Sequence, residues 1–207
     1  MTAIAATRPG DVNNFATYVS FGLAYVLGHG ATALAQGTNP LVAMPGWLPQ
    51  AILIAGLAAG SVAATLAAAR AQRGADRSDR LAGQLLGLSW IVGFGALFLA
   101  LAALSLSPTA ADLRTVLMPA GSGLVVGLLY FGEGAARRNV LHWGLGVWLA
   151  LISAAGLFLG SAGLFWVLAL AGGGGYAAAA LLERRRRAGT YSDAGPAEPV
   201  RDSRVWN

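Results

Sequence analysis

Hydrophobic residues in this chain gather into six long stretches that contain no Asp, Glu, Lys or Arg. Each stretch is 18 to 26 residues long, and together they cover 15–36, 47–69, 81–106, 115–132, 140–160 and 164–182. An α-helix needs about 20 apolar residues to cross the hydrocarbon core of a bilayer, and a charge at its centre costs about 3 kcal/mol. The pattern therefore predicts an all-α, polytopic membrane protein with six transmembrane helices.

The arginines predict how these helices are oriented. All 14 basic residues are arginine, and 13 of them lie at the termini or in alternate gaps between spans, with only Arg114 in the other gaps. Cytoplasmic loops of membrane proteins carry such an excess of positive charge. We therefore expect both termini to be cytoplasmic, the external loops to be short, and the protein to lie in the bacterial cytoplasmic (inner) membrane as a multi-pass protein.

The chain is expected to divide into three parts. Residues 1–14 form a cytoplasmic N-terminal segment, and residues 15–182 form the six-helix transmembrane domain. Residues 183–207 form an Arg-rich cytoplasmic tail, whose content of Ala, Gly, Pro and charge predicts disorder.

Composition excludes several classes of function. The chain is 56% hydrophobic and 11% charged, against about 25% charged residues in soluble domains, which argues against a water-soluble enzyme. It lacks Cys and Lys, which excludes thiol catalysis, Cys-ligated metals and lysine Schiff bases. We therefore expect no enzyme activity, catalytic residue, metal or cofactor. The arginines flank membrane spans, where anionic lipid headgroups account for them, so we expect no nucleic-acid partner.

The first span carries its polar residues on one helix face. Tyr18, Tyr25, His29 and Thr32 follow one another at intervals that bring them to the same side of a helix, and the fourth span has a comparable face. Two interpretations stay open: these side chains bond one another away from lipid, or they line a path for a substrate or ion. The candidates for the path are Tyr18, Tyr25, His29, Thr32, Ser122, Tyr130 and Glu133.

Three titratable residues have different expected roles. His29 lies inside the first span, where an ionisable group is a functional candidate, and an imidazole suits proton transfer. The alternative is a structural His29 that a neighbouring hydroxyl satisfies. Glu133 precedes Arg137 by four residues, a spacing that favours an ion pair. His142 stands beside Trp143 at the start of the fifth span, and we expect it at the membrane surface.

Glycines mark close packing and one unusual segment. G-x-x-x-G pairs, which allow helices to approach closely in lipid, occur at Gly56/Gly60, Gly83/Gly87, Gly123/Gly127 and Gly156/Gly160. The sixth span contains the hinge candidates Gly172, Gly173, Gly174 and Gly175. Each glycine costs about 1 kcal/mol in helix propensity relative to Ala, so this run predicts either a flat packing face or a hinge.

Three segments carry a resemblance to known proteins. Residues 21–30 (FGLAYVLGHG), 87–93 (GLSWIVG) and 121–127 (GSGLVVG) resemble uncharacterised bacterial six-helix integral membrane proteins, some of which carry a generic ABC-permease label. The resemblance implies a transport component. The chain has no Walker A sequence, so any ATP hydrolysis needs a separate protein.

We therefore expect an integral membrane transport component, a permease-like bundle with a polar path along its first and fourth helices. The alternative is a non-transporting accessory or regulatory subunit of a membrane complex. Expected partners are membrane lipids, a second copy of the chain, and a separate ATPase or other membrane subunit.

Overall fold

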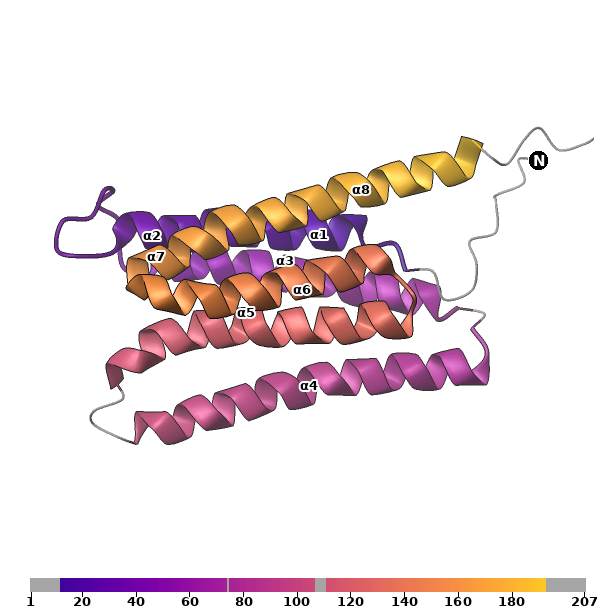
Figure 1. Ribbon diagram of the computed structural model, residues 1–207, viewed down its shortest axis with the longest axis horizontal. Helices are drawn as coiled ribbons and strands as arrows, with labels where there is room; N and C mark the ends of the chain where they lie inside the picture. The colour runs from indigo at the N-terminus through magenta and orange to yellow at the C-terminus, as the bar shows by residue number, and fades with distance from the viewer. Residues whose placement is uncertain (1–11, 74, 107–110, 193–207) are drawn as a thin grey trace, which may run out of the picture.

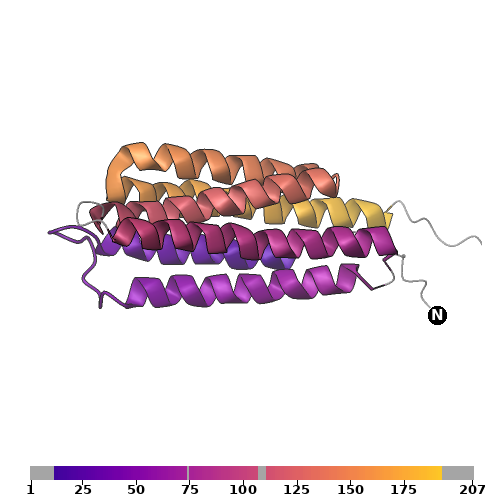
Figure 2. The ribbon, with the colours of Figure 1, turned by 90° about the horizontal axis from the view of Figure 1, so that it is seen from below.

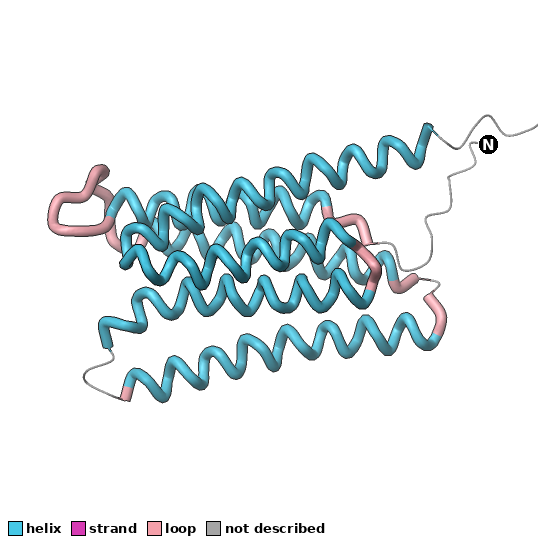
Figure 3. The backbone as a smooth tube through the Cα atoms, in the orientation of Figure 1, coloured by secondary structure: helices cyan, strands magenta, loops and turns pink. Residues whose placement is uncertain are grey.

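The computed structural model describes residues 12–73, 75–106 and 111–192, and this part of the chain folds into helices without any strand (Figures 1 and 3). The helices lie side by side in one elongated bundle. In chain order they are α1 (Phe15–Leu23), η1 (Ala24–His29), α2 (Gly30–Ala35), α3 (Leu48–Ala71), α4 (Arg77–Ser105), α5 (Ala111–Ala136), α6 (Val140–Gly156), η3 (Leu157–Leu159), α7 (Gly160–Val167), η4 (Leu168–Gly172) and α8 (Gly173–Ser192).

Two stretches contain a π-helical segment between α-helical ones. In residues 15–35, η1 follows α1 and leads directly into α2, and in residues 160–192, η4 joins α7 to α8. The two π segments pack against each other inside the bundle. Single π turns within α-helices occur frequently at functional sites, so the contact between the two segments marks a candidate functional region.

Four stretches of the described chain are long and apolar enough to cross a membrane: Leu48–Ala71, Arg77–Ser105, Leu113–Ala136 and Val140–Ala188. This confirms an all-helical protein suited to a membrane, but not the expected number of crossings. The fourth stretch contains a reversal at Gly160, whose φ of 67° suits glycine. Beyond it, the chain runs back along α6 through α7 and α8 (Figure 2). Residues 15–35 carry the polar stripe and are not among the four.

Described arginines concentrate at one end of the bundle. This end holds the start of α1, the ends of α3, α5 and α8, and the start of α4 (Figure 1). Ten of the eleven arginines in the described ranges belong to these helix ends or their connections, and Arg114, near the start of α5, is the exception. We call this the arginine end of the bundle.

Glycines bring α3 against the first helical stretch. A β carbon placed on Gly56 would lie 2.6 Å from the β carbon of Ala24, and one on Gly60 would lie 2.5 Å from the ring of Phe21. The pair therefore packs closely, as expected. Two other expected packing glycines do not: nothing lies within 4 Å of a β carbon on Gly87, and Gly160 forms the turn after η3 instead.

The end of the transmembrane domain differs from the expected boundary. We expected a disordered tail from residue 183, but α8 continues to Ser192. Residues 193–207, and residues 1–11 at the other terminus, lie outside the described residues. Glu183 explains part of this continuation, because its fully buried carboxylate accepts hydrogen bonds from Arg186 and Arg187 at 2.9–3.1 Å along the same helix.

Candidate functional site

Six tyrosine and histidine side chains form a continuous buried array through the bundle. Each has at most 5% of its surface exposed. They come from helices far apart in sequence, namely α1 with η1, α5, α6 and α8. The members of this Tyr–His array, in spatial order, are His29, Tyr25, Tyr176, Tyr130, His142 and Tyr18.

Ring contacts connect the array along its length. The ring centroids of His29 and Tyr25 are 4.9 Å apart, and those of Tyr25 and Tyr176 are 5.2 Å apart, both edge to face. Tyr176 and Tyr130 follow at 6.3 Å, and Tyr130 lies 4.1 Å from His142. Such separations are typical of packed aromatic pairs. The array therefore joins the π segment η1 to the arginine end.

Glycines on the neighbouring helices make room for these rings. A β carbon on Gly172 would lie 2.6 Å from the ring of Tyr25, and one on Gly22 would lie 3.2 Å from the β carbon of Tyr176. Side chains at these two positions would displace the tyrosines. The first glycine of the four-residue run therefore serves the array directly.

The rest of that run is helical and mostly packed. Gly173 begins α8 directly after η4 ends at Gly172, so the backbone stays helical through all four glycines. A β carbon on Gly173 would meet Val26 and one on Gly175 would lie 2.6 Å from Trp148, whereas nothing lies within 4 Å of one on Gly174. Three of the four positions thus act as a packing face. Their role as a hinge stays a prediction.

Close packing of α5 on α6 places the polar end of the array. A β carbon on Gly127 would lie 2.5 Å from the backbone nitrogen of Ala150, and one on Gly146 would lie 2.6 Å from the carbonyl oxygen of Gly127. The two backbones can touch only because side chains are absent there. This contact brings Tyr130 and Glu133 of α5 over His142 of α6.

His142 lies at the centre of this polar end. Asn139 caps α6 by accepting a hydrogen bond from the His142 backbone N–H at 3.1 Å. The imidazole Nδ1 lies 2.8 Å from the hydroxyl of Tyr18, and Nε2 lies 3.6 Å from a carboxylate oxygen of Glu133. A carboxylate beside Nε2 favours the tautomer with its proton there, so the Tyr18 hydroxyl donates to Nδ1.

His142 is buried against the other helices near the start of α6. Only 4% of its surface is exposed, and its expected depth at the membrane surface beside Trp143 stays a prediction. Trp143 occupies the outer side of α6 and is 41% exposed. Adjacent residues on a helix point about 100° apart, so one can face lipid while the next faces the bundle.

Glu133 connects two basic groups. Its carboxylate accepts a hydrogen bond from Arg137 at 3.0 Å, as the spacing of four predicted, and its other oxygen faces His142. The Glu133 and Arg137 side chains are 18% and 22% exposed. Arg137 and His142 therefore lie on the two oxygens of one carboxylate.

The opposite end of the array is apolar around its imidazole. His29 is 5% exposed, and its ring lies 5.9 Å from that of Phe165. Its Nδ1 is buried and has no hydrogen-bond partner among the described residues. Buried polar atoms of this kind are where internal water completes hydrogen bonding.

Two of the predicted path residues belong neither to the array nor to the His142–Glu133 pair. Thr32 donates its hydroxyl to the backbone carbonyl of Gly28 at 2.9 Å, one turn earlier on its own helix. Ser122 is half-buried and lies two turns before Tyr130 on α5, about 12 Å along the helix axis. The other five candidates are brought together, with Glu133 against His142.

A cavity of about 330 Å³ lies beside the polar end of the array, between α1, α3, α4 and α5. Thr17, Trp90, Tyr130, Glu133 and His142 are among the residues that line it. The Thr17 and Tyr130 hydroxyls and His142 Nε2 are buried without a hydrogen-bond partner in the described part of the chain. These unpartnered polar atoms therefore belong to residues that line the cavity close to the Glu133 carboxylate.

Sequence reasoning missed Tyr176 and the buried side of His142. Tyr176 is the only tyrosine in the last uncharged span, which was the available signal. No three His, Cys, Asp or Glu residues cluster within the described ranges. Comparison of the chain with protein-family models, curated proteins and solved structures found no match.

Proposed function

We propose that this chain is an integral membrane transport component that moves protons along the Tyr–His array. The observation that carries the proposal is the unbroken sequence of buried rings from His29 to the His142–Glu133 pair. Both residue types in the array can accept and donate protons. Burying six polar side chains in an apolar core costs free energy unless they are hydrogen-bonded. Ionisable groups inside a membrane are therefore candidates for function.

The dimensions of the site favour a proton over a larger solute. The 330 Å³ cavity adjoins the array, and its lining includes none of the deeper members Tyr25, His29 and Tyr176. Those three rings pack edge to face, so a solute would have to separate them. A proton needs only a hydroxyl, an imidazole nitrogen or an internal water at each step.

The same proposal includes six membrane crossings, with both termini in the cytoplasm of a bacterium. The reversal at Gly160 supports two crossings within 140–188, and residues 15–35 provide another that is polar on its inner face. The arginine end supports the cytoplasmic assignment. Glu133 and His142 then face the cytoplasm, and the array leads outward from them to His29.

The test is proton flux in reconstituted vesicles. Purified protein is placed in liposomes that contain the pH-sensitive dye pyranine, and a valinomycin-driven potassium gradient supplies the membrane potential. We expect acidification well above that of protein-free vesicles. Tyr176→Phe and His29→Gln remove proton-carrying groups while keeping most of the packing, and each should reduce the flux about tenfold or more.

Ser89→Ala provides the matched control. Ser89 is exposed on α4 and donates to its own helix backbone at 2.9 Å, so the variant loses a hydroxyl outside the array. Flux equal to that of empty vesicles, or unchanged flux in both array variants, would overturn the proposal. Recovery of a stoichiometric membrane partner on mild purification would then favour the accessory-subunit alternative.

A separate ATPase is not needed for this function. Helices α3 and α4 leave only residues 72–76 between them, which is a small surface for docking a second protein. The proton gradient itself then supplies the driving force. An ATPase stays a possible partner, which co-purification would detect. It assigns no catalytic residue.

A further inference from the structure

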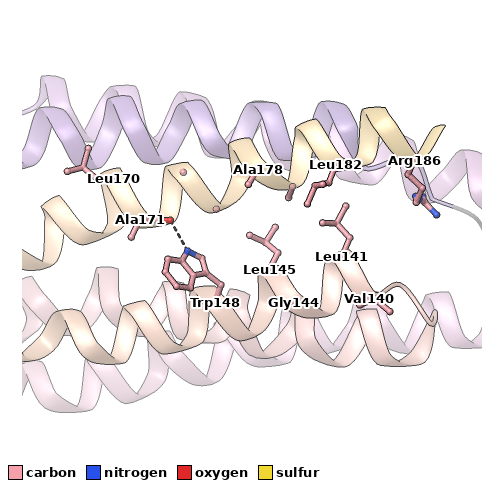
Figure 4. A pocket seen from close by; sticks show the side chains of 13 residues that line it. Val140, Leu141, Gly144, Leu145, Trp148, Leu170, Ala171, Ala178, Leu182 and Arg186 are labelled. Atoms are coloured by element: carbon pink, nitrogen blue, oxygen red, sulfur yellow. Dashed lines mark hydrogen bonds between the residues drawn. The ribbon is translucent and has the colours of Figure 1, made fainter. Parts of the chain in front are cut away.

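A long apolar groove runs along the outside of the bundle between α6 and α8 (Figure 4). Its volume is about 860 Å³, and it is separate from the Tyr–His array. Small residues line both of its walls, with Gly144 on α6 and Gly174 on α8 among them. Nothing lies within 4 Å of a β carbon placed on either glycine, so the groove is open where they lie.

The groove has the length and polarity of an acyl-chain site. On α8 it extends from Gly174 to Arg186, and with Leu170 of η4 it covers 17 residues, or about 24 Å from the first to the last at 1.5 Å per residue. Half of the hydrocarbon core is about 15 Å thick. The indole N–H of Trp148 donates to the carbonyl of Ala171 at 2.8 Å, which leaves an apolar ring facing the groove.

Charge lies at one end of the groove only. Among the described residues that line the groove, only Arg186 is charged, and it lies at the arginine end, opposite Trp148 and Leu170 (Figure 4). Arg184 and Arg185 are exposed beside it on α8. Arg186 also holds Glu183 at 3.0 Å, which fixes where its guanidinium lies. A guanidinium is suited to binding a phosphate group.

We propose that this groove binds one anionic phospholipid, with an acyl chain along α6 and α8 and its phosphate at Arg186. The apolar length and the single charged end match the two parts of such a lipid, and the groove runs along the bundle axis as a lipid chain does. A second copy of this chain would have to place an anionic group at Arg186 and a narrow apolar ridge along the groove. The lipid supplies both. This inference does not depend on proton movement.

Native mass spectrometry of the purified full chain tests the site. The protein is released from micelles containing equal amounts of phosphatidylglycerol and phosphatidylcholine, and the retained lipid is counted. We expect one phosphatidylglycerol per chain. Gly144→Leu and Gly174→Leu fill the groove from its two walls, and each should reduce the retained lipid at least tenfold. Gly132→Leu is the matched control, since its β carbon also meets open space but lies on α5.

Arginine variants test the headgroup separately. Arg186→Gln should lower the preference for phosphatidylglycerol about fivefold, the effect of one cation at a membrane surface, while Arg184→Gln outside the groove should change it much less. Equal effects of the two variants would overturn the site, because they would indicate general surface charge. Unchanged lipid retention in both groove-filling variants would also overturn it, as would a change in oligomeric state instead of lipid binding.

Discussion

The hydrogen bond between Tyr18 and His142 offers a direct measure of how strongly the polar end of the array is held. Tyr18→Phe removes only the hydroxyl that lies 2.8 Å from Nδ1 of His142. The tyrosine is fully buried and the histidine is 4% exposed. Removal of the hydroxyl therefore leaves the buried Nδ1 of His142 without its hydrogen-bond donor.

The expected cost follows from this burial. Leaving a buried acceptor unpaired costs about 1–3 kcal/mol in proteins generally, and hydrogen bonds between membrane helices contribute about 0.6–2 kcal/mol. The phenylalanine ring keeps the packing of the tyrosine ring, so no cavity is added. We therefore expect Tyr18→Phe to lower the free energy of unfolding by about 1–2 kcal/mol.

A double-mutant cycle isolates this contribution. Unfolding free energies are measured in mixed micelles for the unmodified protein, Tyr18→Phe, His142→Leu and the double variant. Because the two residues touch, the double variant should lose about 1 kcal/mol less than the sum of the single losses. Additivity within about 0.3 kcal/mol, or no measurable loss in Tyr18→Phe, would refute the assignment of a structural hydrogen bond here.

Three further predictions concern other parts of the bundle. Gly146→Ala should destabilise the protein by about 2 kcal/mol through overpacking on α5, whereas Gly144→Ala, two residues earlier and facing open space, should be neutral or stabilising; thermal unfolding midpoints compare them. The Asp79 backbone N–H donates to Asp76 and holds the pKa of that carboxyl below its ordinary value. Its stabilisation of the α4 N-terminus is therefore present above the unfolded-state pKa and is lost as pH falls through the folded-state pKa. The protection of first-turn amides from exchange, corrected for the intrinsic exchange rate at each pH, should therefore fall at low pH and should lose this dependence in Asp76→Ala. Glu183→Gln should cost about 2 kcal/mol, since it weakens charged hydrogen bonds to a fully buried group, and unfolding measurements at constant pH check this.

Most of the fold could be predicted from where charges are absent. The uncharged windows 47–69 and 81–106 correspond closely to α3 and α4, because the cost of a charge in lipid acts on every residue of a span. Boundaries outside the spans are less constrained. The continuation of α8 to Ser192 depends on local pairing between Glu183 and the arginines that follow it. Composition alone predicts a disordered tail for the same residues.

The candidate site could be predicted only where its residues repeat along one helix. Tyr18, Tyr25 and His29 share a face, and the spacing is visible in the sequence. Tyr176 and His142 join them from other helices. Their depth in the bundle depends on glycine contacts between helices, and the spacing of residues along the sequence does not reveal such contacts. The π segments were also invisible, because they arise from a shift in backbone hydrogen bonding rather than from a residue type.

The attachment of α4 has a consequence for the order in which the bundle comes apart. Among the described helices, α4 packs substantially only against α5 and lies at the edge of the bundle (Figure 1), whereas α1, α6 and α8 enclose the core. In a bilayer, a departing helix exchanges protein contacts for lipid contacts of similar apolar character. Movement of α4 therefore disturbs the least packing, and it belongs to the low-stability end of local opening. Trp90 of α4 forms part of the cavity wall. One side of the cavity is therefore formed by the most weakly packed of the long described helices.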